Sequence, residues 1–209
     1  MDQNYIINIG RQLGSGGRQI GEILASQLGI SFYDKELIQI ASQESGLGKE
    51  FFEKFDEKDS HSLFGGLFGV LGTFSDEIYS NSYLNNETLF RIQSDVIRKL
   101  AEQKSCIFIG RCADYILKDY PRCLNVFVTA NLEDRIKRVA EKEHITENKA
   151  KDLIEKTDKK RSGYYNYYSN KVWGAASSYH LCINSSLLGI DDTVTYILQL
   201  VKKKFETVS

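Results

Sequence analysis

A glycine-rich loop between a short apolar strand and a helix is the feature that most constrains this chain. Residues 8–21 have the sequence Asn-Ile-Gly-Arg-Gln-Leu-Gly-Ser-Gly-Gly-Arg-Gln-Ile-Gly. Glycines allow backbone N–H groups to turn inward around an anion, and the helix that follows adds the partial positive charge of its N-terminus. The segment therefore predicts a phosphate site in an α/β protein, and the chemistry it suggests is nucleotide binding.

The loop departs from the P-loop pattern Gly-x-x-x-x-Gly-Lys-Ser/Thr. With Gly17 as the last glycine of the pattern, Gln12 takes the first position, Arg18 the lysine position and Gln19 the position of the magnesium-binding hydroxyl. The alternative to a phosphate site is a strand-to-helix turn that needs glycine only for its backbone angles.

The composition bounds the number of domains and the kinds of partner. A chain of 209 residues with 42% hydrophobic content is long enough for one well-packed domain and too short for two ordinary ones. Its 27 basic and 28 acidic side chains nearly cancel, which argues against binding nucleic acid or a membrane surface through the overall field. Any anion site must therefore be local.

Two further absences in the sequence bear on compartment. No apolar run approaches the roughly 18 residues of a membrane span, and the start at Met1 lacks the basic and then apolar run of a signal peptide. The four cysteines form no Cys-x-x-Cys pair, so we expect buried, reduced thiols in a cytoplasmic protein. The three histidines show no metal-ligand spacing, so no protein metal site is predicted.

Strand-like runs alternate with segments of helical periodicity, which predicts parallel strands joined by crossover helices. The expected strands are 5–9, 30–33, 106–110, 124–129 and 180–184. The expected helices are 17–28, 35–44, 87–103, 131–142, 146–160 and 191–205. Asn131 and Thr146 are expected to cap the helices that they precede.

Two clusters beyond the loop carry charge suited to phosphate. Arg111 follows Gly110 directly at the end of a strand, the edge at which open α/β sheets bind ligands, and its planar fork suits a phosphate. The alternative is a surface arginine capped by Asp114. Residues 158–168 join basic and tyrosine side chains, which predicts a lid over phosphates, a solvated helix end above packed tyrosines, or single-stranded nucleic-acid binding.

Residues 45–86 differ in character, because apolar residues and glycines mix there without clear periodicity around Gly65. We expect a mobile insertion, and a subunit contact in a homo-oligomer is the alternative.

Together, these motifs resemble the cytidylate kinase-like family of P-loop kinases, relatives of the nucleoside monophosphate kinases, over nearly the whole chain. The motifs are Gly14–Arg18, Phe32–Asp34, Gln93, Gly110–Asp114 and the run from Asp158 to Tyr168 that leads to Trp173, Gly174 and Tyr179.

The resemblance implies a three-layer α/β/α P-loop kinase fold with a five-stranded parallel sheet, a helical insertion and a small lid. It implies a single domain over residues 1–209, with a core of 1–44, 87–157 and 179–209, an acceptor-binding insertion at 45–86 and a lid at 158–178. The activity implied is transfer of a phosphoryl group from ATP, with Mg²⁺, to CMP or a related nucleoside monophosphate.

The same resemblance implies roles for individual residues. The residues expected to bind the donor phosphates are Gly14, Ser15, Gly16, Gly17, Arg18, Gln19 and Ile20. Those expected to bind the acceptor are Asp34, Arg91, Gln93, Arg111 and Asp114. Those expected in the lid are Arg135, Arg138, Asp158, Lys160, Arg161 and Tyr165. Arg18, Arg111 and Arg161 are expected to neutralise charge on the transferring group, and Gly163 is a candidate hinge.

Two points qualify these expectations. Arg91 and Gln93 are two positions apart on one helix and face different sides, and Arg91 is the preferred ligand. Arginine in place of the P-loop lysine leaves open a binding module that holds nucleotide without transferring phosphate, and the unusual insertion leaves open a kinase for another small molecule.

Overall fold

The computed structural model describes residues 4–34 and 83–205, which fall in two compact units. One unit is Met1–Asp34 with Ala101–Ser209, and the other is Lys35–Leu100. The expected helix at 35–44 and the expected mobile insertion, as far as residue 82, lie outside the described residues.

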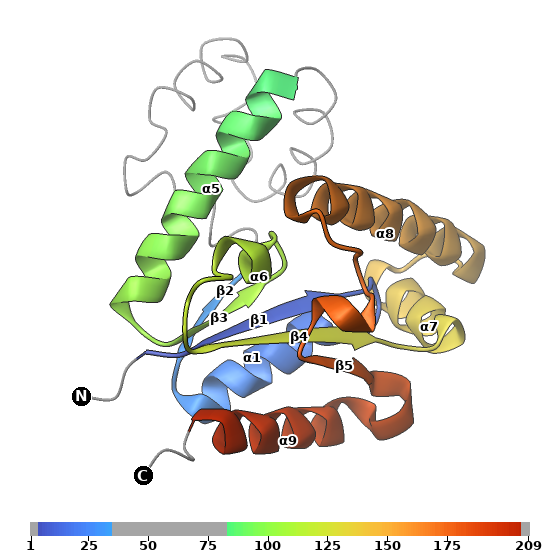
Figure 1. Ribbon diagram of the computed structural model, residues 1–209. Helices are drawn as coiled ribbons and strands as arrows, with labels where there is room; N and C mark the ends of the chain where they lie inside the picture. Colours follow the sequence, from blue (N-terminus) through green and yellow to red (C-terminus); the bar gives the residue numbers. More distant parts are fainter. Residues whose placement is uncertain (1–3, 35–82, 206–209) are drawn as a thin grey trace, which may run out of the picture. The chain divides into compact units, whose positions relative to one another are not determined.

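Five parallel strands form one sheet in the first unit, with the order β2-β3-β1-β4-β5 (Figure 1). The strands are β1 Ile6–Arg11, β2 Ser31–Tyr33, β3 Cys106–Ile109, β4 Cys123–Thr129 and β5 Leu181–Asn184. Each expected strand is present, with ends that differ by one or two residues. The parallel α/β prediction is therefore confirmed.

The helices agree with the prediction less well than the strands do, both in their number and in their ends. They are α1 Gly17–Leu28, α5 Tyr83–Gln103, α6 Ala113–Ile116, α7 Leu132–Glu143, α8 Glu147–Ser169, α9 Ser185–Phe205 and the 3-10 turn η1 Ala176–Ser178. The short α6 was not expected, and α8 continues past the predicted end at Lys160. Helix α9 starts earlier than predicted and contains a break at Gly189, where φ is 76° and ψ is 176°.

Caps explain why some helix ends were predictable. Helix α1 lies between left-handed glycines, Gly16 at its N-cap and Gly29 at its C-cap, which favour those backbone angles. Thr146 caps α8 by accepting a hydrogen bond from the Lys149 N–H at 3.4 Å. The expectation for Asn131 was wrong, because its side chain makes no cap bond and accepts from Asn184 Nδ2 at 3.0 Å.

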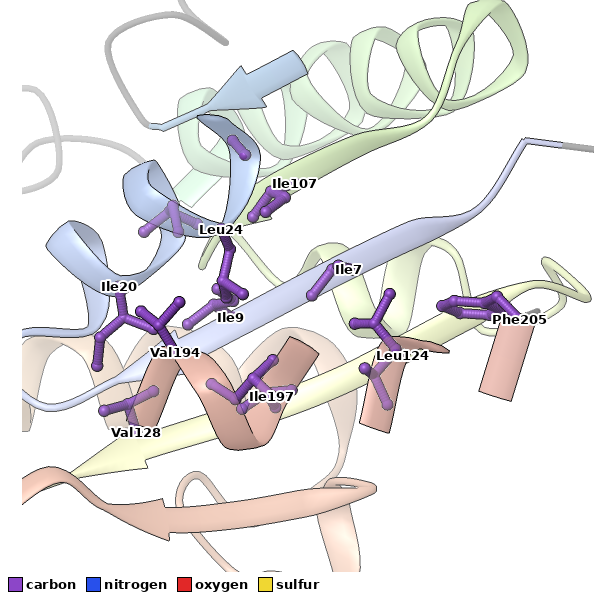
Figure 2. Packing of buried hydrophobic residues seen from close by; sticks show 14 residues of the cluster. Ile7, Ile9, Ile20, Leu24, Ile107, Leu124, Val128, Val194, Ile197 and Phe205 are labelled. Carbon is purple, nitrogen blue, oxygen red and sulfur yellow. The ribbon is translucent and has the colours of Figure 1, made fainter. Parts of the chain in front are cut away.

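The main core lies between the sheet and the pair α1 and α9 (Figures 1 and 2). Ile7 and Ile9 of β1 are fully buried there with Ile20 of α1 and Ile197 of α9. Burying each such side chain contributes about 1.5–3 kcal/mol. The alternating residue Asn8 of β1 is also buried, so both faces of the sheet are covered, as is usual for parallel sheets.

The cysteines follow the prediction at three of four positions. Cys106, Cys112 and Cys123 are buried free thiols, and burial raises the pKa of Cys106 and of Cys123 to about 12. Cys182 is exposed on β5, so the prediction of burial was wrong there. Among the described residues, none of the helices is long and apolar enough to span a membrane.

The sheet order defines where a ligand is expected. Strands β1 and β3 are neighbours, and the helices that follow them, α1 and α6, lie on opposite faces of the sheet (Figure 1). Such a point, where connections leave to opposite sides, opens a crevice at the carboxyl ends of the strands. The loop at Gly14 follows the carboxyl end of β1, and the turn at Arg111 follows the carboxyl end of β3.

Candidate functional site

The glycine-rich loop after β1 folds into a turn with two left-handed glycines, Gly14 with φ of 78° and Gly16 with φ of 77°. Left-handed residues in alternation turn successive N–H groups toward one side, which is the geometry of an anion-binding nest. Gly16 is the N-cap of α1, so the N-terminus of that helix opens onto the same loop and adds partial positive charge. The loop is therefore shaped to receive an anion.

Several backbone N–H groups of this loop are available to bind a ligand. Within the part of the chain that the structure describes, the N–H groups of Gly14, Gly16, Gly17 and Gln19 have no hydrogen-bond partner. The Ile20 N–H differs, because it donates to the Gly16 carbonyl at 2.9 Å while the side chain lies in the core. The structure therefore places Ile20, which was predicted as a phosphate ligand, in the core.

Contacts from two other elements hold the loop in this shape. The Ser15 hydroxyl donates to the Gln12 carbonyl at 2.8 Å, and the Ser15 carbonyl accepts from the Ser185 hydroxyl at 2.7 Å. The Thr129 hydroxyl at the end of β4 donates to the Gln12 side-chain oxygen. The predicted ligand Ser15 is fully buried, so its side chain supports the loop from inside.

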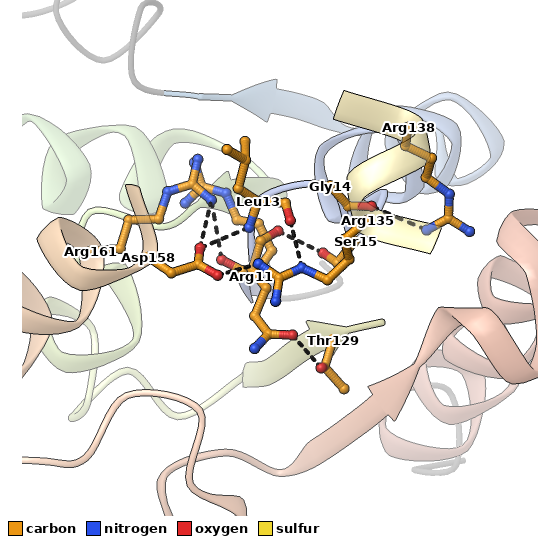
Figure 3. Close-up of polar contacts among 10 residues, drawn as sticks. Arg11, Leu13, Gly14, Ser15, Thr129, Arg135, Arg138, Asp158 and Arg161 are labelled. Atoms are coloured by element: carbon orange, nitrogen blue, oxygen red, sulfur yellow. Dashed lines mark hydrogen bonds and ion pairs between the residues drawn. The ribbon is translucent and has the colours of Figure 1, made fainter. Parts of the chain in front are cut away.

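Arginines of α7 bind the carbonyl groups of the loop (Figure 3). Arg135 Nε donates to the Leu13 carbonyl at 2.7 Å, and Arg138 Nη1 donates to the Gly14 carbonyl at 3.2 Å. A Cβ at Gly14 would lie 2.7 Å from the Arg135 carbonyl oxygen, so glycine is required for this close approach. Both arginines were predicted on the lid side, and the structure places them against the loop itself.

Helix α8 reaches the loop through Asp158 and Arg161 (Figure 3). The Asp158 carboxylate accepts from the Leu13 N–H at 2.9 Å, forms a buried ion pair with Arg135, and lies 4.0 Å from Arg161 Nη1. Arg161 Nη1 also donates to the Arg11 carbonyl at 3.4 Å. These two predicted lid residues therefore lie in one cluster with the loop.

Positive charge accumulates around this cluster. Burial lowers the pKa of the Arg161 guanidinium, and the positive charges of Arg135 and Arg111 lower this pKa further. The nearby Asp158 carboxylate raises it. Like charges this close repel one another in a partly buried site. A polyanion in the loop would relieve that repulsion, which makes the site suited to a polyphosphate.

Arg111 lies on an unusual turn at the end of β3. Gly110, Arg111 and Cys112 are successive left-handed residues, with φ of 72°, 56° and 55°. This conformation costs about 1–2 kcal/mol for each residue that is not glycine. The Arg111 guanidinium lies over the ring of Tyr164 on α8, 5.8 Å from its centroid.

Arg11, at the end of β1, was missed by the sequence reasoning. A Cβ on Gly110 would collide with Arg11 Nη1, so the arginine side chain crosses the space beside the end of β3. The signal that could have found it is the repeated Gly-Arg pair at the ends of two strands, residues 10–11 and 110–111.

Asp114 and Tyr165 form a buried pair that joins α6 to α8. The Tyr165 hydroxyl donates to Asp114 Oδ2 at 2.7 Å. Burial raises the pKa of the Asp114 carboxyl, and the hydrogen bond from Tyr165 works in the opposite direction. Asp114 was expected at the acceptor and Tyr165 in the lid, and the structure brings the two together.

Arg18 and Asp34 form a second pair, at the ends of α1 and β2. Arg18 donates to Asp34 Oδ2 from Nε at 3.0 Å and from Nη2 at 2.7 Å, and it pairs with Glu22 at 2.7 Å. Asp34 is buried, whereas the Arg18 side chain is 56% exposed. The arginine expected on the donor phosphates thus contacts a residue expected at the acceptor.

Three further predicted residues lie on α5 and α8. Arg91 and Gln93 lie on α5 in the second unit, where Gln93 is buried and Arg91 is exposed, opposite to the preference for Arg91 as the inward residue. Lys160 is exposed on α8. Over residues 4–34 and 83–205, no three His, Cys, Asp or Glu side chains gather as metal ligands.

Comparison with known proteins identifies the family of the chain. The chain matches the cytidylate kinase-like family over residues 6–187, which include the loop, Arg111 and helix α8. No curated protein matches it. An uncharacterized protein from Eubacterium ventriosum has a similar structure, with a TM-score of 0.71 and 26% identity over 95% of this chain and 99% of that one.

Two shikimate kinases share the fold at lower identity. The enzyme from Bacteroides thetaiotaomicron has a TM-score of 0.53 and 13% identity, covering 95% of this chain and 98% of its own. The enzyme from Acinetobacter baumannii, in complex with shikimate, has a TM-score of 0.54 and 16% identity, covering 100% and 97%. The chain has a P-loop kinase-like fold, and it belongs to the cytidylate kinase-like family.

Proposed function

We propose that this protein transfers the γ-phosphoryl group of ATP to CMP or a related nucleoside monophosphate. The observation that carries the proposal is the loop of open amides at Gly14, Gly16 and Gly17, surrounded by arginines from α7 and α8. Membership of the cytidylate kinase-like family supports nucleotides as the substrates.

The roles proposed for side chains follow from their positions. The loop amides bind the donor phosphates, and Arg161 neutralises charge that develops on the transferring group. Arg111, at the end of the neighbouring strand, binds the phosphate of the acceptor. Arg18 acts on the acceptor side through its pair with Asp34, in a reaction catalysed by positioning and electrostatics.

Magnesium in this proposal arrives with the nucleotide. The carboxylates nearest the arginines, Asp34 and Asp158, are already bound by guanidinium groups, and the described residues hold no cluster of metal ligands. Mg²⁺ keeps several waters and binds phosphate oxygens readily, which fits a site with few protein ligands. The ion would supply charge neutralisation on the phosphates.

The domain organisation remains part of the proposal. We propose one P-loop kinase-like domain in which residues 45–86 shape the acceptor site and residues 158–178 close over the phosphates. The first part of the lid, as far as Ser169, is continuous with α8. Closure would therefore move the whole end of a helix, and Gly163 lies in the helix interior.

The test is a transfer assay with labelled ATP and Mg²⁺ against a panel of nucleoside monophosphates. We expect labelled diphosphate from CMP, and a loss of about 10³-fold or more in Arg161→Ala, the scale for an arginine acting on a transferring phosphoryl group. Lys156→Ala, an exposed change on the same helix, is the matched control and should retain activity. Absence of product with every monophosphate would refute the proposal.

A nucleotide-binding module without transfer is the second candidate. It is favoured by the lack of a P-loop lysine between Gly10 and Gly21. Calorimetry with ATP and CMP, alongside the assay, separates the two functions, since binding without product would favour the module. A kinase for another small molecule would transfer phosphate only to acceptors outside the nucleotide panel. A shikimate kinase, which shares this fold, is such an enzyme.

A further inference from the structure

The start of helix α1 suggests an alignment to the P-loop pattern that differs by one residue from the alignment based on sequence. In the pattern, the lysine follows the last glycine and opens the helix. The left-handed glycine before α1 is Gly16, and α1 begins at Gly17. With Gly16 as the last glycine, the lysine position falls on Gly17 and the first position of the pattern falls on Arg11. The lysine position therefore has no side chain.

The Arg11 side chain fills the space that a side chain at residue 17 would need. A Cβ on Gly17 would lie 2.6 Å from Arg11 Cβ and 3.2 Å from Arg11 Cγ. Farther out, Arg11 Nη1 lies against Gly110, next to Arg111. The side chain thus runs from the start of α1 toward the end of β3, where Arg111 follows Gly110.

We propose that Arg11 supplies the loop cation that contacts the terminal phosphates of a bound polyphosphate, in place of a P-loop lysine. This inference rests on the proposed function for the nature of its ligand. Arg11 is the last residue of a central strand, and its carbonyl is held by Arg161 at 3.4 Å, so its backbone is fixed. Arg18, one residue beyond Gly17, binds Asp34 and acts elsewhere.

A charge-relocation experiment tests this inference with inorganic tripolyphosphate as the probe, measured by calorimetry on the full chain. Arg11→Gly should weaken binding about 10- to 100-fold, the range for losing one hydrogen bond between charged groups. Adding Gly17→Lys to Arg11→Gly should recover most of that loss. Removing Arg11 frees the space, and Val128 Cβ, at 3.3 Å, is the nearest neighbour left to the new Cβ.

Two controls keep the result interpretable. Arg11→Lys retains a cation on the strand and should bind within several-fold of the wild type, and circular dichroism should show all variants folded. Lys156→Ala should leave binding unchanged. Arg11→Gly binding as tightly as wild type would overturn the inference, as would a folded double variant that recovers nothing.

The same measurements separate this inference from the proposed function. A wild-type protein that binds tripolyphosphate but never transfers phosphate would refute the phosphotransferase and leave the role of Arg11 supported by the relocation. A wild-type protein that transfers phosphate, with Arg11→Gly unaffected in binding, would refute only the role of Arg11. A wild-type protein that binds no polyphosphate would refute both.

Discussion

Asp158 is the carboxylate around which the loop arginines are arranged. It accepts the Leu13 N–H, pairs with Arg135 and lies near Arg161, so one negative charge stabilises a backbone turn and two guanidinium groups. The Arg135 and Asp158 side chains are only 7% and 15% exposed. Removing one member of a buried ion pair leaves an uncompensated charge, which costs more than the pair itself contributes.

We therefore predict that Asp158→Asn lowers the free energy of unfolding by about 3 kcal/mol, measured by urea denaturation. Asparagine keeps the size and an oxygen for the Leu13 N–H, so the effect isolates the charge. The control is Asp95→Asn, whose pair with Arg98 has side chains 51% and 53% exposed and should change stability by less than about 0.5 kcal/mol. Equal effects of the two changes would contradict this account.

Asp114 gives a prediction for pH. Because its pKa is raised in the folded protein, its contribution to stability is largest below the ordinary aspartate pKa of about 3.9 and is lost as pH rises through the raised value. The free energy of unfolding of the wild type, minus that of Asp114→Asn, should thus decrease between about pH 4 and pH 8. Urea denaturation across that range measures both free energies. An increase in the difference as the pH rises would be inconsistent with a raised pKa.

Side-chain partners were the least predictable part of the site. The loop glycines were predictable because the need for unusual backbone angles is local. The partner of Arg18 was not, since Asp34 follows the next strand and the direction of Arg18 depends on where α1 begins. Successive side chains on a helix differ in direction by about 100°, so the sequence pattern alone does not say which residue at the start of α1 faces a phosphate.

At the scale of elements, α8 organises the site. Asp158, Arg161 and Tyr165 are spaced at i, i+3 and i+7, so they lie on one face of the helix and contact the loop and α6. The predicted end at Lys160 was wrong because Gly163 and the tyrosines after it have weak helix propensity. The hydrogen bonds of Arg161 to the Arg11 carbonyl and of Tyr165 to Asp114 stabilise the helix beyond that point.

Gly163 therefore offers a test of the hinge idea. It lies inside α8, and a Cβ there would meet nothing within 4 Å. We predict that Gly163→Ala raises the free energy of unfolding by about 0.5–1 kcal/mol, measured by urea denaturation. The matched control is Gly174→Ala, which should destabilise, because Gly174 has φ of 76° and its Cβ would lie 3.2 Å from Phe127. A stabilised Gly163→Ala protein with full transfer activity would argue against a hinge at this residue.

At the scale of the whole molecule, the strand order assembles the site. The loop after β1 and the turn after β3 are about 100 residues apart in sequence but follow neighbouring strands, which lie roughly 4.8 Å apart. Periodicity predicted parallel strands, yet it contains no information on their order, because each strand is similarly apolar. The order depends on how the helices pack across both faces.

A polyphosphate bound at the proposed site should stabilise the folded protein. We predict that tripolyphosphate at about 100 times its dissociation constant raises the melting temperature by about 5–10 °C, measured by calorimetric melting. Raising the salt concentration should reduce the effect, because the interaction is between charges that are partly exposed. An unchanged melting temperature, in a protein shown to bind the probe, would mean that the site is equally available in the unfolded chain.

The left-handed turn at residues 110–112 shows that this chain is not optimised for stability alone. Glycine tolerates the backbone angles of Arg111 better than any other residue, so Arg111→Gly should be more stable than Arg111→Ala by about 1 kcal/mol in urea denaturation. Arginine is therefore not the residue that the backbone angles at position 111 favour, and it lowers the stability of the fold there. Directed evolution for heat resistance, without a screen for activity, should then replace this arginine early.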